Sequence, residues 1–205
     1  MSRRPVRETP SIDSEVRDED WYGRALSAET HTRVAFVDVD MTEVLTESSV
    51  FDGCTFRGVR FNASRHVESA FLNCTFRSCT FFDTSFVRCK MVGSTFDRCT
   101  FSSLEATGGD WSFVGLAGAD LRKVRFDGTR LREADLTDAR AEGTQLRDVD
   151  LTSAWLHGAD LSRADLRGAE LATIEPSTVT LTGAVIGPEQ AVAIAEALGL
   201  EVRTD

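Results

Sequence analysis

Residues 71–101 read FLNCTFRSCTFFDTSFVRCKMVGSTFDRCTF, and a large apolar side chain stands at every fifth position of this stretch. The same step of five runs from Phe36 to Leu171 without a shift. Of those 28 positions, 24 are Phe, Leu, Met or Trp, and the residue two places earlier is small or β-branched in 27 cases. The exceptions are Thr46, His66, Ala106 and Ala141 at the large position and Leu104 at the small one. A unit this short cannot fold alone, so the pattern predicts a stack of repeats.

A period of five fits neither an α-helix nor a β-strand, whose apolar periods are 3.6 and 2 residues. It predicts a short extended segment followed by a corner, with four segments closing a square coil of 20 residues. Coils would stack at the strand spacing of about 4.8 Å, which makes residues 34–186 a rod roughly 36 Å long. Glycine often follows the large residue by two, where a tight turn favours a missing Cβ: Gly53, Gly58, Gly93, Gly118, Gly128, Gly143, Gly158 and Gly168.

Three segments carry a recognisable motif: Ala-Asp-Leu-Thr-Asp at 134–138, Ala-Asp-Leu-Ser-Arg at 159–163 and Ala-Asp-Leu-Arg-Gly at 164–168. They resemble the A(D/N)LXX consensus of the pentapeptide-repeat family. That resemblance implies an all-β fold, a right-handed quadrilateral β-helix, over residues 31–186. The spacing by itself does not determine the handedness.

The two ends of the chain depart from the repeat. Residues 1–30 are of mixed charge with Pro5 and Pro10, so we expect a disordered arm there. Residues 187–205 contain a short α-helix, because Pro188 and Glu189 suit a first helical turn and Gly199 suits the end of the helix. The run between them is rich in alanine and strongly helix-forming.

This C-terminal helix is apolar on nearly every side, so it must either cap the coil beneath it or contact a partner. We hypothesise a homodimer through this end of the rod. The spacing i, i+3, i+4, i+7 defines one contacting stripe, with two flanking residues. The predicted interface is Ala191, Ile194, Ala195 and Leu198, flanked by Val192 and Leu200.

The sequence contains no recognisable catalytic or cofactor-binding motif. No Gly-rich phosphate loop, CxxC, HExxH or GxSxG is present, so we expect no enzyme, no cofactor and no small-molecule substrate. No metal site is expected, since His66 is the one histidine that would point inward. All five cysteines stand at the small position and are expected to be buried, reduced hydrophobes: Cys54, Cys74, Cys79, Cys89 and Cys99. The chain shows neither a membrane-spanning run nor a signal-peptide core, and we expect a cytoplasmic protein with no membrane partner.

The charge balance is acidic, with 33 Asp and Glu against 23 Lys and Arg. Residues 101–205 hold 18 of the acids and 10 of the bases, which argues against direct nucleic-acid binding and for a basic partner. Asp directly before Leu also has a structural interpretation, because Asp at a corner can accept a hydrogen bond from nearby backbone. That interpretation leaves the acids at other outward positions unexplained.

A closer resemblance concerns function. Phe71-Leu-Asn-Cys-Thr-Phe76, the spacing from Ser85 to Phe96, and the end from Gly183 to Leu200 resemble the MfpA-type fluoroquinolone-resistance proteins. The resemblance implies a DNA mimic that binds DNA gyrase and dimerises through its C-terminal end. The unbroken register argues against the projecting loops of Qnr-type relatives. The alternatives are an interaction scaffold without DNA mimicry and, for a gyrase binder, either protection from a drug or toxin or simple inhibition.

The predicted gyrase-binding surface consists of acids at outward positions of the C-terminal half. Rows of carboxylates at a regular pitch can stand in for DNA phosphates. The residues are Asp120, Asp127, Glu133, Asp135, Asp138, Glu142, Asp148, Asp150, Asp160, Asp165 and Glu170.

Overall fold

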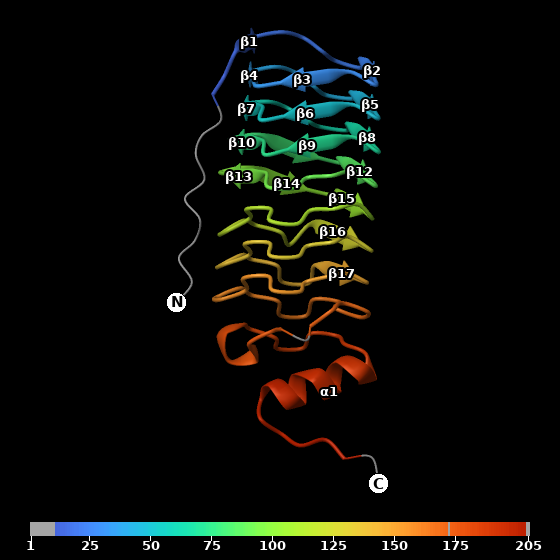
Figure 1. Cartoon of the computed structure of the whole chain (residues 1–205), viewed down its shortest axis with the longest axis vertical. Coiled ribbons are helices and arrows are strands. Elements are labelled where there is room, and N and C mark those ends of the chain that lie inside the picture. The colour runs from blue at the N-terminus through green and yellow to red at the C-terminus, as the bar shows by residue number, and fades with distance from the viewer. Residues whose placement is uncertain (1–10, 172, 204–205) are drawn as a thin grey trace.

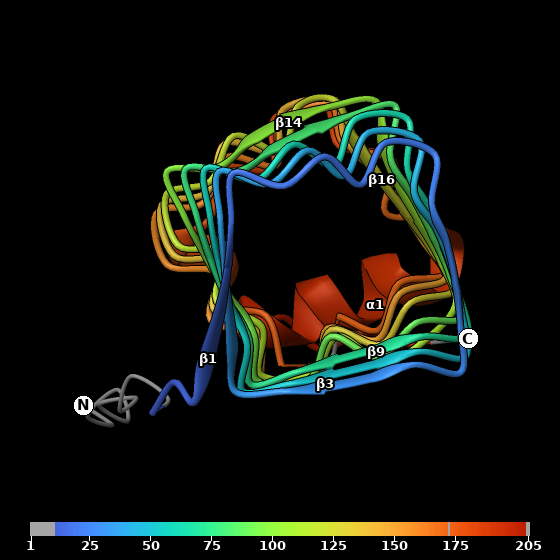
Figure 2. The same ribbon diagram turned by 90° about the horizontal axis from the view of Figure 1, so that it is seen from above.

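The protein is a straight rod of stacked square coils with one helix across its C-terminal end (Figure 1). The computed structural model describes residues 11–171 and 173–203. Viewed along the rod, four sides enclose the interior, and α1 (Pro188–Ala197) crosses one end (Figure 2). The predicted quadrilateral β-helix is confirmed, and every strand pairs in parallel with the strand one coil away.

Each side of the rod is a ladder of short parallel strands. Side 1 contains β1 (Ser14–Arg17), β4 (Val34–Val37), β7 (Thr55–Arg57), β10 (Thr75–Arg77) and β13 (Thr95–Asp97). Side 2 contains β11 (Thr80–Phe82) and β14 (Thr100–Ser102). Side 3 contains β2 (Ala25–Ser27), β5 (Leu45–Glu47), β8 (Arg65–Val67), β12 (Ser85–Val87), β15 (Leu104–Thr107), β16 (Val124–Asp127) and β17 (Gln145–Arg147). Side 4 contains β3 (Thr30–Thr32), β6 (Val50–Asp52) and β9 (Ala70–Leu72). Isolated bridges continue the ladders toward the C-terminus, where a 3₁₀ turn, Pro176–Thr178, interrupts the last coil.

In nearly every unit the corner lies two residues after the large side chain and takes a left-handed backbone, with Lys123 as an exception. Glycine meets this need at Gly58 (φ +66°), but Asp38 (φ 55°) and many other non-glycine residues adopt it as well. The cost of that conformation is offset because the corner N–H donates to the next coil, as from Asp38 to the carbonyl of Arg57 at 2.8 Å. The predicted corner glycines are therefore confirmed, and stacking extends the same turn to other residue types.

The interior is a continuous column of large side chains. The every-fifth residues from Phe36 to Leu171 are buried, including the four exceptions to the large-residue rule. Phenylalanine rings one coil apart stack face to face, as Phe56 and Phe76 do at 4.7 Å between ring centroids. The coil is not distorted at Ala106, because the buried Leu104 occupies the small position two residues earlier and replaces the volume that a large side chain would fill.

The coil begins earlier than expected. Residues 11–30 are not a disordered arm but the first coil, with β1, β2 and β3 in register on the coil below. Trp21 and Leu26 continue the five-residue step backward and are buried. The small positions of this coil hold charged residues, which an end coil tolerates because they reach solvent: Glu19 accepts the Trp21 indole N–H at 2.7 Å, and the Arg24 guanidinium lies 4.9 Å from that ring. The expectation for residues 1–10 lies outside the described residues.

The far end of the rod is closed by its own helix. The Gln190 side chain donates to the carbonyls of Leu166 (2.6 Å) and Ala169 (2.7 Å), which have no following coil to bond. Its Oε1 accepts the N–H of Gly187 at 2.7 Å. This contact blocks an open strand edge, the feature that otherwise promotes aggregation.

Candidate functional site

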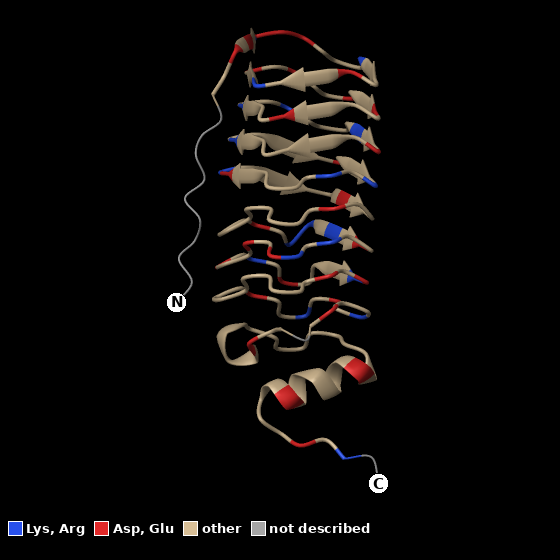
Figure 3. Cartoon of the chain, viewed as in Figure 1, with Lys and Arg blue, Asp and Glu red and all other residues tan. Residues whose placement is uncertain are grey.

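The eleven predicted acids all lie outside the core, but they do not share one face. Asp135 belongs to side 1, Asp120 and Asp160 to side 2, Asp127 and Asp165 to side 3, and Asp150 and Glu170 to side 4. The expected acidic surface therefore wraps around the rod. Lys, Arg, Asp and Glu are interspersed along these coils (Figure 3).

Arginines neutralise several of these acids locally. Asp120 is within 2.7 Å of Arg122 and 2.9 Å of Arg140, and the bond from Arg122 lowers the pKa of Asp120 to about 2. Asp165 is bound by Arg167 at 2.7 Å, which also lowers its pKa. Two further ion pairs join Asp150 to Arg132 at 3.5 Å and Glu142 to Arg163. Each pair screens a carboxylate that the sequence analysis assigned to a partner.

Other acids have a structural role at the corners. The carboxylates of Asp135, Asp150 and Asp160 accept the backbone N–H two residues later, at 3.1, 3.0 and 2.9 Å. The structural interpretation of Asp before Leu is confirmed at these positions.

A smaller group of acids is exposed and, among the described residues, unpaired, at three different corners of the rod. Glu133, Asp138 and Asp148 are exposed corner residues with φ of 53°, 55° and 53°, and none makes an ion pair within the part of the chain that the structure describes. Asp127 is exposed as well, and its register neighbour is Arg147. We call Glu133, Asp138 and Asp148 the corner acids.

Charge alternates along the rod in blocks. Residues 11–50 hold ten acids and three bases, residues 51–130 hold eight acids and eleven bases, and residues 131–205 hold fourteen acids and six bases. A division of the chain at residue 101 does not reveal this pattern, because it cuts the basic band in two. Two acidic ends therefore flank a central band of net positive charge.

The C-terminal helix divides the predicted dimer stripe between two environments. Ile194 packs against the core of its own rod, and Ala195 is half-buried. Ala191, Val192, Leu198 and Leu200 are exposed, with Leu198 at 57% and Leu200 at 61%. The capping interpretation holds for one face of the helix, and the other face is apolar and exposed.

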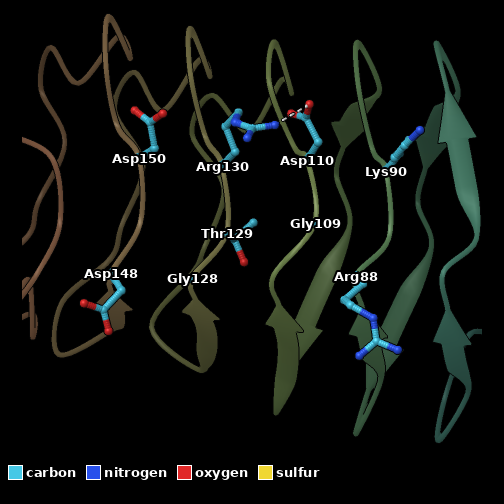
Figure 4. Close-up of a pocket in the computed structure, with 9 residues that line it drawn as sticks. All are labelled: Arg88, Lys90, Gly109, Asp110, Gly128, Thr129, Arg130, Asp148 and Asp150. Carbon is cyan, nitrogen blue, oxygen red and sulfur yellow. Dashed lines mark hydrogen bonds and ion pairs between the residues drawn. The ribbon is translucent and has the colours of Figure 1, made fainter.

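A groove lies where side 3 meets side 4, across the boundary between the basic central band and the acidic end (Figure 4). Its volume is about 630 Å³. Gly109 and Gly128 form part of its floor, and a Cβ at Gly109 would lie 2.1 Å from the carbonyl oxygen of Cys89, so only glycine fits there. Sequence reasoning missed this site, although a signal was present: Lys90, Asp110, Arg130 and Asp150 alternate in charge at 20-residue spacing.

The inward polar groups act in packing. Ser64 donates to the carbonyl of Phe61 at 2.6 Å, so its oxygen accepts the Nε2–H of His66 (3.0 Å), while His66 Nδ1 accepts from Thr46 (2.9 Å). Burial lowers the pKa of His66 to about 3, which keeps the ring neutral. The cysteines are free, and burial raises the pKa of Cys89 to about 11. Among the described residues, no three His, Cys, Asp or Glu side chains converge on a point where a metal ion could bind, and no helix has the length and apolar character of a membrane span.

Comparisons with known proteins support the repeat. A family described as "Pentapeptide repeat region" matches residues 79–154, and "Pentapeptide repeats (8 copies)" matches 144–172. A third family, "SV2A/B/C luminal domain", matches residues 24–101. No curated protein is significantly similar in sequence.

Two solved structures are similar to this chain, and the first of them shares its fold. A trypsin-treated form of QnrB1, described as a plasmid-mediated fluoroquinolone resistance protein, has a TM-score of 0.56 at 18% identity, covering 94% of this chain and 98% of its own. The pentapeptide-repeat protein HetL, from the cyanobacterium Nostoc, has a TM-score of 0.35 at 18% identity, covering 83% of this chain and 82% of its own. The five-residue register, the square coil and the family matches agree: residues 79–172 of this chain consist of pentapeptide repeats.

Proposed function

We propose that this protein acts without catalysis, by binding DNA gyrase in place of DNA. The observation that carries the proposal is the acidic excess of residues 131–186, which hold ten acids and five bases at outward positions of a rigid rod. A basic surface shaped for duplex DNA would attract such a rod, because complementary charge speeds and orients the encounter. The sequence resemblance to MfpA-type proteins supports this partner, and its site of action would be the cytoplasm.

The local ion pairs narrow the surface that such a partner would contact. An acid that pairs with an arginine of the same chain presents little net charge to a partner, whereas each unpaired corner acid presents a full negative charge. The proposed contact therefore wraps around the rod and includes Glu133, Asp138 and Asp148 at three of its corners, with the paired acids contributing shape more than charge.

Reversing the corner acids tests the proposal. The variant Glu133→Lys/Asp138→Lys/Asp148→Lys should inhibit gyrase supercoiling about tenfold more weakly than wild type or worse, because several exposed contacts are lost together. The control Asp52→Lys/Asp83→Lys changes two acids of the central band, of which Asp52 is half-buried and Asp83 exposed, and it should inhibit as wild type does. Inhibition by wild type should also weaken with rising salt, since exposed charges are screened within about 8 Å at physiological ionic strength.

The second candidate is an interaction scaffold without DNA mimicry. The neutralised acids and the basic central band favour it, because duplex DNA has no positive segment. Equal inhibition by the corner-acid variant and by wild type, or no inhibition by either, would reject mimicry by this surface and leave the scaffold.

We also propose that two rods join through the exposed face of the C-terminal helix. Leu198→Glu/Leu200→Glu should yield a folded monomer, because both side chains leave the core of their own rod untouched. Ile194→Glu should instead lower the melting temperature, since Ile194 packs on that core. Light scattering and circular dichroism separate the two results, and a monomeric wild type at micromolar concentration would exclude this dimer.

A further inference from the structure

We propose that the groove face is a second self-association surface, on which two rods pair side by side and antiparallel. The surface has two rows, and Figure 4 labels the whole of the first row and Arg88, Gly128 and Asp148 of the second. The alternating row is Lys90, Asp110, Arg130 and Asp150, each in register with the next. The corner row is Arg88, Gly108, Gly128 and Asp148. This inference does not rest on the proposed function, although Asp148 belongs to both proposed surfaces.

The alternating row is complementary to its own reverse. Its charges run plus, minus, plus, minus from Lys90 to Asp150. A twofold axis across the rod, between the coils of Asp110 and Arg130, places Lys90 against the partner subunit's Asp150 and Asp110 against the partner subunit's Arg130. Every position of the row then meets an opposite charge, and the same contacts recur on both sides of the axis.

The corner row obeys the same symmetry. Arg88 would meet the partner subunit's Asp148, and the two glycines between them would meet glycines. Gly108 and Gly128 carry no side chain, and a Cβ at Gly128 would find no atom within 4 Å, so the centre of the surface is hollow. That hollow lets two rods approach closely at the axis.

A parallel arrangement is disfavoured by the same charges. Rotation about an axis along the rod would bring the alternating row of one copy against the corner row of the other. Lys90 would then lie near the partner subunit's Arg88, and Asp150 near the partner subunit's Asp148. Like charges at both ends oppose this pairing, so the surface selects the antiparallel one.

Some of the charged side chains needed for pairing are not held by ion pairs within the described part of their own chain. No ion pair involves Lys90 or Asp148 in the range 11–203, residue 172 aside. Arg130 and Asp110 pair within the chain at 3.1 Å and would form a four-membered network with their copies. Exposed ion pairs are individually weak, so we expect a weak association that falls with rising salt.

Zero-length cross-linking with a carbodiimide reads out the contact directly. The chain has two lysines, Lys90 and Lys123. Lys90 and Asp150 of one chain are three coils apart, about 14 Å, so an amide between them requires a second copy. In Leu198→Glu/Leu200→Glu, which removes the proposed helix contact, we expect a cross-linked dimer joined through Lys90 and Asp150. Lys90→Arg, the matched control, should lose the cross-link and keep the association.

A charge swap tests the energetics by sedimentation at low salt. Lys90→Glu and Asp150→Lys should each weaken association about tenfold, and the double variant should restore it. The exchange of Arg88→Glu with Asp148→Arg repeats the test on the corner row. It provides a second measurement if Asp150→Lys disturbs the fold, because that substitution removes the carboxylate that Thr152 bonds. A monomer at all concentrations in low salt, a cross-link that excludes Lys90, or double variants that remain as weak as the singles would overturn the proposal.

Discussion

Replacing Phe76 by alanine is expected to lower the free energy of unfolding by roughly 3–5 kcal/mol. Phe76 is fully buried, and its ring stacks between Phe56 at 4.7 Å and Phe96 at 4.6 Å. The substitution removes a ring from the middle of a continuous column, and the coils above and below are held by backbone pairing, so the space cannot collapse freely. Urea unfolding followed by circular dichroism measures the effect.

Phe82 provides the matched control. Phe82 lies on β11, on the next side of the rod, and is 58% exposed. We therefore expect Phe82→Ala to change the free energy of unfolding by less than about 0.5 kcal/mol. Comparable losses at Phe76 and Phe82 would contradict the assignment of the every-fifth residues to the core.

Lowering the pH below 6.5 is expected to destabilise the fold through His66. Burial lowers the pKa of His66 from 6.5 to about 3, so between these values the unfolded chain binds a proton that the folded chain does not. Stability from this group is complete above about pH 6.5 and is lost as the pH falls toward 3. The loss is about 1.4 kcal/mol for each pH unit in that window.

The double variant Thr46→Val/His66→Phe isolates this contribution. It removes the imidazole together with the hydroxyl that bonds Nδ1 and retains a ring to stack on Phe86, which lies 4.7 Å from His66. Carboxylates titrate equally in both proteins, so the difference in unfolding free energy between wild type and variant should fall by about 2–3 kcal/mol over the first two pH units below 6.5. A difference independent of pH would show that His66 is not held neutral by burial.

Most of the fold could be predicted because one residue type at one spacing decides it. A large side chain every five residues can be buried only if four units close a coil, and this also brings residues 20 apart into register. Cys54 and Cys74 are 20 residues apart, so the sequence alone predicts that they stack in neighbouring coils. The start of the rod could not be predicted, because the small positions of the first coil hold Glu19, Arg24 and Glu29, which break the pattern but reach solvent at an open end.

The candidate site was less predictable, since charge depends on neighbours that only the folded chain supplies. The sequence places Asp120 and Asp165 outward, as found, but their net charge depends on Arg140 and Arg147, which lie in neighbouring coils. The corner acids become distinct from the other carboxylates only once these pairs are known.

The sequence by itself determined the coil, its register, the buried column and the sign of the total charge, because each follows from periodicity or composition. Only the tertiary structure decided which carboxylates remain unpaired, which face of the C-terminal helix is open, and where a groove lies. These properties depend on contacts between coils and on the spaces left where Gly109 and Gly128 lack side chains. A linear pattern specifies such contacts only after the coils are stacked.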